Sequence, residues 1–590
     1  MILIGKPFIF LIHLSLIFRS LSQSVDGVYR GFPDSWNGDQ FKRIKCPSKN
    51  IPVFLDGYFL CQFSASYGNL SESPGRKLTH MNDAIGAVGS FQISNGQVYF
   101  SAQYYPSRPY KIWEFYNRNM SQTFVPWARF SAYNRTSKEI PENIDSAPFH
   151  PNLNFWKIGK RIVAGTEAPQ WIGYEFDVRT LSNFKLLNLF EDNRIFKNAH
   201  TSIIPLSMSI HERIDSNGIL WASFFAVDSK DMKFYQGVFI IEPSGVRKVV
   251  GLYNFSEIDI HSCTENDEYN GELSDLPGYV HSITSTENYI VIPITSLLLN
   301  PCKLKEPPIN EDSEIQNGGI WGMDFYEMAP LRFLIFDKNT GQWSTEKPLE
   351  AFPSMFITHQ INAFEKEGII MADMVAYEND DPFIKYFSTD FLTTQIYPKT
   401  ARLLRFSLDI NNNRVMYNYL LSKGTTATDF PQINYEYNEK PYQWAYVLNH
   451  PFAADNYIIK INVNDPSGTK NKVFKSHRLV LHEPFFVSKP GARNEDAGIL
   501  IVRALDLRQN KGVLLIVDAV SMTEIGRANV SINIPFGFHN RFFTMKNSME
   551  NLDPKANLKT PKAMWYANRL TATTTQSYRR TNRTASSKIY

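Results

Sequence analysis

Residues Phe91–Tyr104 read FQISNGQVYFSAQY, two β-prone runs joined by Ser-Asn-Gly. An Asn-Gly pair adopts the positive φ angles that a tight hairpin needs, so this stretch predicts two antiparallel strands. Further along, an apolar strand runs six times into an acidic residue and then a turn, at irregular intervals of about 50 to 95 residues. These six segments are YEFDVRTL at Asp177, FIIEPSG at Glu242, LIFDKNTG at Asp337, FSLDINNN at Asp409, INVNDPSG at Asp465 and LIVDAVSM at Asp518.

Long amphipathic helical patterns are scarce between these units, which favours an all-β fold built by radial repetition. A propeller blade of four strands needs about 40 residues or more, so the 590 residues predict a seven-bladed β-propeller with long loops that cap its centre. Two or three separate β-sandwiches are the alternative, which the absence of a Pro/Gly/Ser-rich linker disfavours. We expect one propeller domain over residues 25–548 and a basic, Ser/Thr-rich disordered tail over residues 549–590.

The composition is that of a globular protein, with 43% hydrophobic and 20% charged residues. A net charge of +3 is too small for a chain of this size to indicate a nucleic-acid partner. Aromatic residues are frequent, at 14% of the chain. They suit pleated, half-buried surfaces and agree with a β-rich fold.

The N-terminal segment predicts export from the cytoplasm. An apolar run, Pro7–Phe18, is followed by small residues and has the length of a signal peptide, which we place at residues 1–24. Arg19, directly after the run, leaves a signal anchor as an alternative. Six N-x-S/T sequons agree with a secreted glycoprotein: Asn69, Asn119, Asn134, Asn254, Asn529 and Asn582.

The chain has four cysteines, which permit two disulfides in three connectivities. We predict the pairs that are local in sequence, Cys46–Cys61 and Cys263–Cys302.

Four of the twelve histidines lie next to apolar strands in distinctive sequences. The inner strands of a propeller converge on its axis, so one histidine from each of four blades can meet around a single ion. Imidazole suits iron, copper, zinc and nickel, so the histidines alone leave the metal open. They are His211 in SIHERIDSNGILWASFF, His281 in PGYVHSITSTENYIVIP, His359 in FITHQINAFEKEGIIMADMVAYE and His539 in INIPFGFHNRFF.

These four segments resemble the metal-binding histidine segments of the carotenoid cleavage oxygenases, a family that includes the β-carotene oxygenases and the retinal pigment epithelium isomerohydrolase. The similarity extends from about Ile51 to Phe543. The residues that match the family's motifs are His211, Asp215 and Gly218 in the first segment, Pro277, Tyr279, His281 and Ser282 in the second, His359, Asn362, Ala363, Phe364 and Glu365 in the third, and Ile534, Pro535, Phe538 and His539 in the fourth.

The resemblance implies Fe(II) held by the four histidines, and oxidative cleavage of a polyene double bond by O₂. The implied substrate is a carotenoid or apocarotenoid, taken up through peripheral contact with a membrane. No catalytic side chain beyond the metal centre is implied. A retinyl-ester isomerohydrolase and a secreted, non-enzymatic carotenoid-binding propeller stay open as alternatives.

The family also uses carboxylates that hydrogen-bond three of the histidines and fix their tautomers. The matching residues are Glu167, Asp429 and Glu483. The family has Glu where this chain has Asp429, which is one methylene shorter. We therefore expect a lengthened or water-bridged bond from Asp429 to His359.

Overall fold

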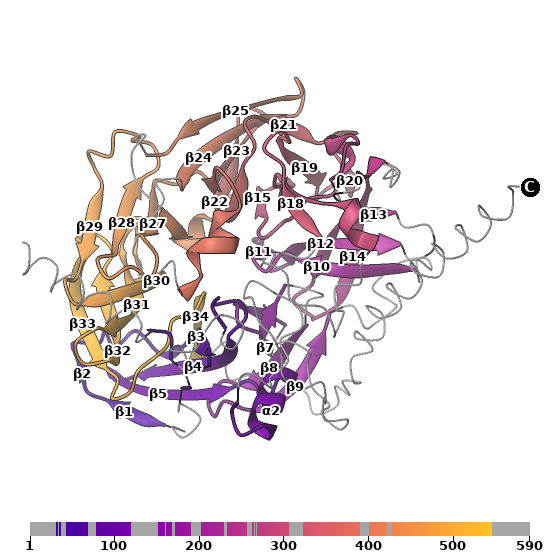
Figure 1. Ribbon diagram of the computed structural model, residues 1–590. Helices are drawn as coiled ribbons and strands as arrows, with labels where there is room; N and C mark the ends of the chain where they lie inside the picture. The colour runs from indigo at the N-terminus through magenta and orange to yellow at the C-terminus, as the bar shows by residue number, and fades with distance from the viewer. Residues whose placement is uncertain are drawn as a thin grey trace, which may run out of the picture.

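The computed structural model shows seven antiparallel sheets arranged as blades in a ring (Figure 1). It describes residues 31–33, 35–36, 43–68, 78–119, 151–159, 161–167, 172–189, 202–228, 230, 233–255, 262–264, 266, 268–305, 322–389, 401–421 and 428–545. The predicted all-β class and the seven-bladed propeller are confirmed. The signal peptide, the C-terminal tail and several of the long loops predicted as a cap lie outside the described residues.

The first three blades come from the N-terminal half of the chain, apart from one strand of the first blade that comes from the C-terminal end. In the first blade the strand order is β1 (Ile44–Cys46), β5 (Gln97–Tyr104), β4 (Ile85–Ser94), β3 (Gly57–Ser66) and β34 (Asn540–Thr544). In the second it is β6 (Asn154–Ile158), β7 (Arg161–Thr166), β8 (Ile172–Asp177) and β9 (Ser182–Asn188). In the third it is β10 (Ile203–Met208), β12 (Leu220–Asp228), β13 (Phe234–Ile241) and β14 (Arg247–Asn254), with β11 (Arg213–Ile214) beside β12.

The remaining four blades follow in chain order. The fourth has β15 (Thr284–Ser285), β16 (Tyr289–Ile294), β19 (Leu331–Asp337) and β20 (Gln342–Trp343), with β21 (Leu349–Ala351) beside β19. The fifth has β22 (Phe356–Lys366), β23 (Ile369–Tyr377), β24 (Arg402–Asp409) and β25 (Arg414–Tyr419). The sixth has β26 (Thr428–Gln432), β27 (Trp444–Asn449), β28 (Tyr457–Asn462) and β29 (Lys472–Lys475). The seventh has β30 (Leu479–Ser488), β31 (Gly498–Asp506), β32 (Lys511–Asp518), β33 (Thr523–Asn529) and β2 (Ser48–Lys49).

Both ends of the propeller chain take part in closing the ring. The C-terminal strand β34 pairs with β3 and completes the first blade, with Phe59 opposite Phe542. The N-terminal strand β2 pairs with β33 at the edge of the seventh blade, with Ser48 opposite Ala528. The first and last blades are therefore each built from both ends of the chain.

The predicted turns join the third and fourth strands of every blade. The Asn-Gly hairpin links β4 to β5 with both turn residues at positive φ, 50° at Asn95 and 72° at Gly96. The six acidic segments form the corresponding turns of the other six blades, and each ends on a residue with positive φ, as a type I turn with a following bulge requires. Those residues are Leu181, Gly245, Gly341, Asn413, Gly468 and Met522.

The aspartates among these acidic residues hold their turns by accepting main-chain N–H groups. Asp337 Oδ1 accepts from Asn339 N at 2.7 Å and from Thr340 N at 3.0 Å. Asp518 Oδ1 accepts from Ser521 N at 2.8 Å. A short acidic side chain satisfies turn donors that no strand can pair, which explains why the acid recurs at this point of the blade.

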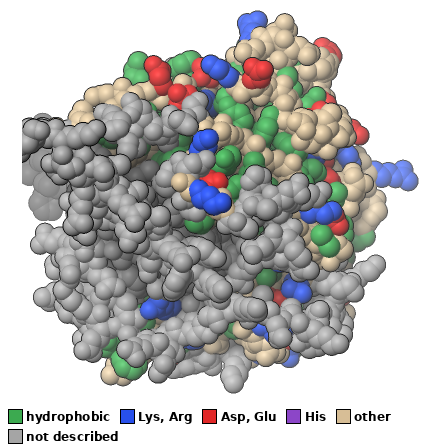
Figure 2. Space-filling model, turned by 90° about the vertical axis from the view of Figure 1, so that its right-hand side faces the viewer, with side chains coloured by type: hydrophobic (Ala, Val, Ile, Leu, Met, Phe, Trp, Pro, Cys, Tyr) green, Lys and Arg blue, Asp and Glu red, His purple; other side chains and the backbone are tan. Residues whose placement is uncertain are grey.

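The described residues contain few helical segments. These are α2 (Arg108–Phe115) and the short segments η6 (Leu273–Asp275), η7 (Pro301–Lys305), η8 (Pro382–Tyr386) and η9 (Tyr435–Tyr437). The strands β17 (Leu297–Leu299) and β18 (Met323–Phe325) form a separate two-stranded sheet. In the sequence they lie between β16 and β19 of the fourth blade. No helix among the described residues is long and apolar enough to cross a bilayer. On the coloured part of the face shown in Figure 2, acidic and basic side chains are interspersed and no histidine is visible.

The cysteine predictions were half right. Cys263 and Cys302 form a disulfide, as expected, whereas Cys46 and Cys61 are free and buried. The predicted Cys46–Cys61 pair was wrong because β5 and β4 lie between β1 and β3 in the sheet. Three strand spacings amount to about 14 Å, far beyond the reach of a disulfide. Burial raises the pKa of both thiols to about 12.

Candidate metal centre

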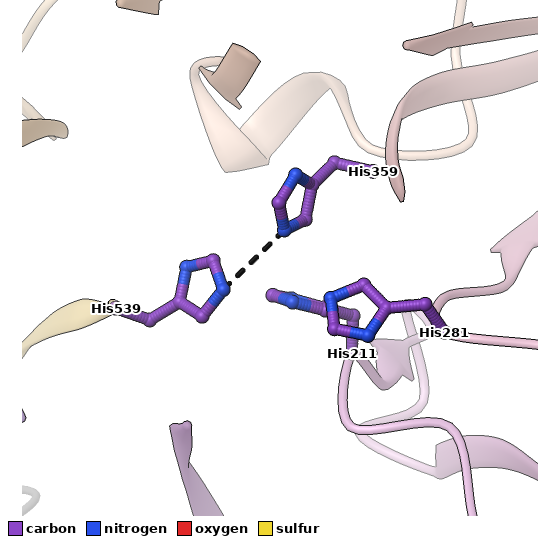
Figure 3. A group of neighbouring side chains, drawn as sticks. All are labelled: His211, His281, His359 and His539. Atoms are coloured by element: carbon purple, nitrogen blue, oxygen red, sulfur yellow. Dashed lines mark hydrogen bonds between the residues drawn. The ribbon is translucent and has the colours of Figure 1, made fainter. Parts of the chain in front are cut away.

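The four predicted histidines meet near the centre of the ring, where β11, β15, β22 and β34 come together (Figures 1 and 3). One ring nitrogen from each of His211, His281, His359 and His539 lies within 4.8 Å of the others. The Nε2 atoms of His359 and His539 are 3.3 Å apart. Figure 3 shows the side chains entering from separate segments and pointing toward one another.

All seven blades contribute one residue to the site. The histidines come from the third, fourth, fifth and first blades: His211 lies between β10 and β11, His281 precedes β15, His359 lies in β22 and His539 precedes β34. The predicted carboxylates come from the other three blades: Glu167 follows β7, Asp429 lies in β26 and Glu483 lies in β30. The ring of blades thus brings the seven predicted site residues together near its centre.

Glu167 supports His281. The Nδ1 atom of His281 lies 3.0 Å from Glu167 Oε2, and Tyr279 donates its hydroxyl to the other carboxylate oxygen. The Tyr279 hydroxyl is also 3.1 Å from His281 Nδ1. Burial, and then the Glu167 carboxylate, raise the pKa of Tyr279 well above its ordinary value, so the hydroxyl keeps its proton and remains a donor.

Asp429 bonds His359 directly, at 2.6 Å between Oδ1 and Nδ1. The expected lengthened or water-bridged bond was wrong. The main chain supplies the reach that the shorter side chain lacks, because β26 has an irregular register between Asp429 and Gln432. Phe430, directly after Asp429, has a φ of 54°, a left-handed conformation that a bulky residue rarely adopts.

Glu483 supports His539. Its Oε1 atom is 3.1 Å from His539 Nδ1 and accepts from Gln432 Nε2 at 3.2 Å. Its Oε2 atom accepts the main-chain N–H of Asn540 at 2.9 Å. In all three pairs the carboxylate engages Nδ1, which leaves the Nε2 lone pair of each imidazole for the centre of the cluster.

His211 differs from the other three histidines. Among the described residues no carboxylate lies within hydrogen-bonding distance of it. Part of its side chain is accessible, yet its Nε2 atom is buried and has no hydrogen-bond partner. A buried ring nitrogen without a partner is costly, and its position among three other imidazoles is that of a metal ligand.

Burial keeps His211 and His359 in the neutral form that binds a metal. Burial, and then the neighbouring histidines, lower the pKa of His211 well below its ordinary value. Burial also lowers the pKa of His359, outweighing the opposite effect of Asp429. For Asp429, burial raises the pKa, but His359 and the other hydrogen-bond donors outweigh it, and the pKa is lowered overall. The pair is therefore a neutral imidazole that donates to a charged carboxylate.

Sequence reasoning missed several residues that hold the carboxylates. Asp429 Oδ2 accepts from the hydroxyls of Tyr377 at 2.9 Å and Thr358 at 3.1 Å. Thr358 is adjacent to a predicted ligand and was open to recognition on that ground. Tyr377 lies at the end of β23, and nothing in its local sequence distinguishes it from a core tyrosine.

The comparison with protein families decides the assignment. The profile of the family described as retinal pigment epithelial membrane protein matches residues 42–544, most of the chain. The chain belongs to this family, the carotenoid oxygenases. The β,β-carotene 15,15'-dioxygenase of Mus musculus is 26% identical over 542 residues, covering 84% of this chain and 88% of the relative. The mitochondrial carotenoid-cleaving dioxygenase of Mustela putorius furo is 27% identical over 311 residues, covering 46% of this chain and 55% of the relative.

Solved structures of this family share the fold. A single-residue mutant of the Synechocystis apocarotenoid oxygenase superposes with a TM-score of 0.66 at 19% identity, covering 88% of this chain and 99% of that chain. The cobalt-substituted form of the Synechocystis enzyme gives a TM-score of 0.65 at 18% identity with the same coverage.

Proposed function

We propose that the protein is an Fe(II)-dependent dioxygenase that cleaves a polyene double bond of a carotenoid or apocarotenoid into aldehyde or ketone products. The observation that carries this proposal is the cluster of four histidines, three of them held by carboxylates, at the axis of a carotenoid oxygenase propeller. Relatives that cover most of the chain are named carotene dioxygenases, which supports the reaction class.

The residues present fit a divalent metal ion. His211, His281, His359 and His539 would hold it, since the unpartnered Nε2 of His211 needs a partner and the other three imidazoles are oriented through Nδ1. The carboxylates Glu167, Asp429 and Glu483 bring negative charge to a buried site, which a cation would offset. A structural neighbour is described as a cobalt-substituted oxygenase, which supports a metal ion in a protein of this fold.

When bound, the iron supplies the oxygen chemistry. The surrounding residues keep His211 and His359 neutral through burial and place apolar side chains beside the cluster. Phe430 packs 5.3 Å from the rings of both His359 and His539, and Phe387 and Phe452 pack against Phe430. A polyene is apolar along its length, and aromatic side chains of this kind provide the contacts that it can make.

The test begins with anaerobic purification of the full chain and metal analysis beside two variants, His281→Ala and His477→Ala. His477 is exposed and outside the cluster, so it is the matched control. We expect near-stoichiometric iron in wild type and His477→Ala, and a loss of iron in His281→Ala. Incubation with β-carotene should yield aldehydes under air and none under argon.

The outcomes separate the alternatives. A well-folded wild type without metal overturns the proposal in favour of a carotenoid-binding protein. A wild type that holds iron, cleaves or isomerises retinyl esters under argon, and forms no aldehydes from carotenoids under air is a retinyl-ester isomerohydrolase. That result overturns the proposal. Oxygen-dependent aldehydes whose masses place the cut in the polyene chain support it.

We further propose that the protein matures in the secretory pathway and contacts lipid peripherally to take up its substrate. The disulfide Cys263–Cys302 suits an oxidising compartment. The sequon residues Asn119, Asn254 and Asn529 are exposed, as glycan attachment requires. The first part is tested by loss of mass on treatment with an N-glycosidase, which should be smaller in a variant that combines Asn119→Gln, Asn254→Gln and Asn529→Gln. Co-sedimentation with neutral lipid vesicles tests the second.

A further inference from the structure

A second layer of polar side chains lies directly behind the histidines. Each histidine is followed in sequence by a buried polar residue: Glu212, Ser282, Gln360 and Asn540. Two of these residues bond each other, because Gln360 Nε2 donates to Ser282 Oγ at 3.3 Å. Ser282 Oγ in turn donates to the Thr358 carbonyl at 2.7 Å. Neighbouring histidine segments are thus tied together just outside the metal centre.

Arg213 joins three of the four segments through one side chain. It follows the first histidine by two positions and is buried. Its Nε donates to the carbonyl of Ile283 at 3.2 Å, and its Nη2 donates to the carbonyl of Gln360 at 3.0 Å. Ile283 lies two residues after His281, and Gln360 lies one residue after His359. The guanidinium therefore fixes the fourth and fifth blades relative to the third.

A second arginine joins the remaining segment to the first. Arg541 lies two residues after His539 and pairs with the buried carboxylate of Glu212, which follows His211. The same Nη1 atom of Arg541 donates to the carbonyl of Phe155 at 2.7 Å. With Arg213, this pair links all four histidine segments around the axis.

The charge of Arg213 is not balanced by an ion pair within the described part of the chain. Among the described residues no carboxylate lies within ion-pair distance of it, so burying the guanidinium carries a desolvation cost without an ion pair to offset it. A guanidinium is planar and presents its N–H groups as a rigid fork, which suits two carbonyls on different strands. A lysine at this position offers a single nitrogen and cannot hold both carbonyls in the same geometry.

We propose that Arg213 is a positioning residue for the metal centre: its guanidinium sets the spacing of the His211, His281 and His359 segments. The proposal rests on the proposed function, because it concerns the geometry of the metal that those histidines hold. Residues that orient ligands in this indirect way alter metal affinity by about 10- to 100-fold when they are replaced.

The chain offers a matched control for a merely structural role. Arg332, in β19, is also buried and also donates to two main-chain carbonyls, those of Ser274 and Leu276. Neither carbonyl is next to a histidine of the cluster. Loss of either arginine should lower the unfolding temperature, whereas only the loss of Arg213 should change the metal centre.

The experiment loads the metal-free full chain with Co(II) and compares wild type with Arg213→Met, Arg213→Lys and Arg332→Met. The measurements are the visible absorption spectrum of bound Co(II), its dissociation constant by titration, and the unfolding temperature of each metal-free protein. We expect Arg213→Met to bind Co(II) about tenfold more weakly than wild type, with a shifted spectrum. Arg213→Lys should fall between them, and Arg332→Met should keep the wild-type spectrum and affinity.

If Arg213→Met and Arg213→Lys both keep the wild-type Co(II) spectrum and affinity and lose only thermal stability, Arg213 is a structural residue and the inference is overturned. If Arg213→Met does not fold, Arg213→Lys decides by the same criteria. A wild type that folds but binds no Co(II) has a different meaning: it refutes the proposed metal function itself.

Discussion

Replacing Asp429 by Asn removes one charge from the metal centre while it keeps the shape of the side chain. Asp429 accepts from four donors: His359 Nδ1 and Phe430 N at Oδ1, and the hydroxyls of Tyr377 and Thr358 at Oδ2. An amide provides one acceptor oxygen and one NH₂ donor. The two hydroxyls can rotate to accept from the NH₂ group, so the effect falls on the two N–H donors at Oδ1.

The size of the effect follows from these two bonds. A hydrogen bond to a charged group contributes about 1.5–3 kcal/mol and a neutral one about 0.5–1.5 kcal/mol, so the two bonds together should lose about 2–3 kcal/mol. We expect the free energy of unfolding of the metal-free protein to fall by that amount. The weakened bond to His359 should lower metal affinity by about 10- to 100-fold, which is about 1.4–2.8 kcal/mol.

The assay is Co(II) titration of the metal-free protein, combined with urea unfolding of the same samples. Asp429→Glu is the control, since it keeps the charge and has the residue that this family places there. We expect Asp429→Glu to bind Co(II) within a few-fold of wild type. Unchanged Co(II) affinity in a folded Asp429→Asn protein would refute the reasoning that the carboxylate tunes the imidazole.

Three further outcomes are expected. Burial lowers the pKa values of His211 and His359, so in the metal-free protein these two imidazoles should take up protons only below the ordinary imidazole pKa of about 6.5. An NMR titration that shows either of them protonating above that pKa contradicts this. Cys302→Ser should lower the free energy of unfolding by about 2–4 kcal/mol, since the disulfide closes a loop with a sequence separation of 39. Identical urea midpoints for the variant and wild type contradict this prediction. Gly537→Ala places a Cβ 1.8 Å from the carbonyl oxygen of Gln62 and should lower the free energy of unfolding by about 3 kcal/mol or more. Urea unfolding measures this, and a loss under about 1 kcal/mol shows that the backbone there can yield.

Much of the fold could be predicted because each blade repeats a local signal. The acid after the third strand and the turn that follows are properties of a few adjacent residues, and they recur around the ring. The exceptions arise where the arrangement of strands, and not the local sequence, decides the structure. Leu181 and Met522 adopt positive φ although neither residue favours it, because the surrounding strands dictate the turn. Cys46 and Cys61 looked paired because they are close in sequence, while the sheet order separates them.

The site divides in the same way. The histidines and their carboxylates could be found since each lies in a distinctive local segment. The bonds of Arg213 and Tyr377 could not, because they join residues on separate strands or blades, and their partners depend on how those strands lie side by side. The direct Asp429–His359 bond was missed for a related reason, since side-chain length was considered without the irregular register of β26.

The closure of the ring by β34 has a consequence for the order of folding. His539 directly precedes β34, the last strand of the propeller, and that strand pairs with β3 near the start of the chain. A chain emerging during synthesis therefore carries only three of the four imidazoles until its final strand has been made and has found its place. Metal uptake at full affinity should follow completion of the propeller, so that an ion at the axis marks a chain that has finished folding.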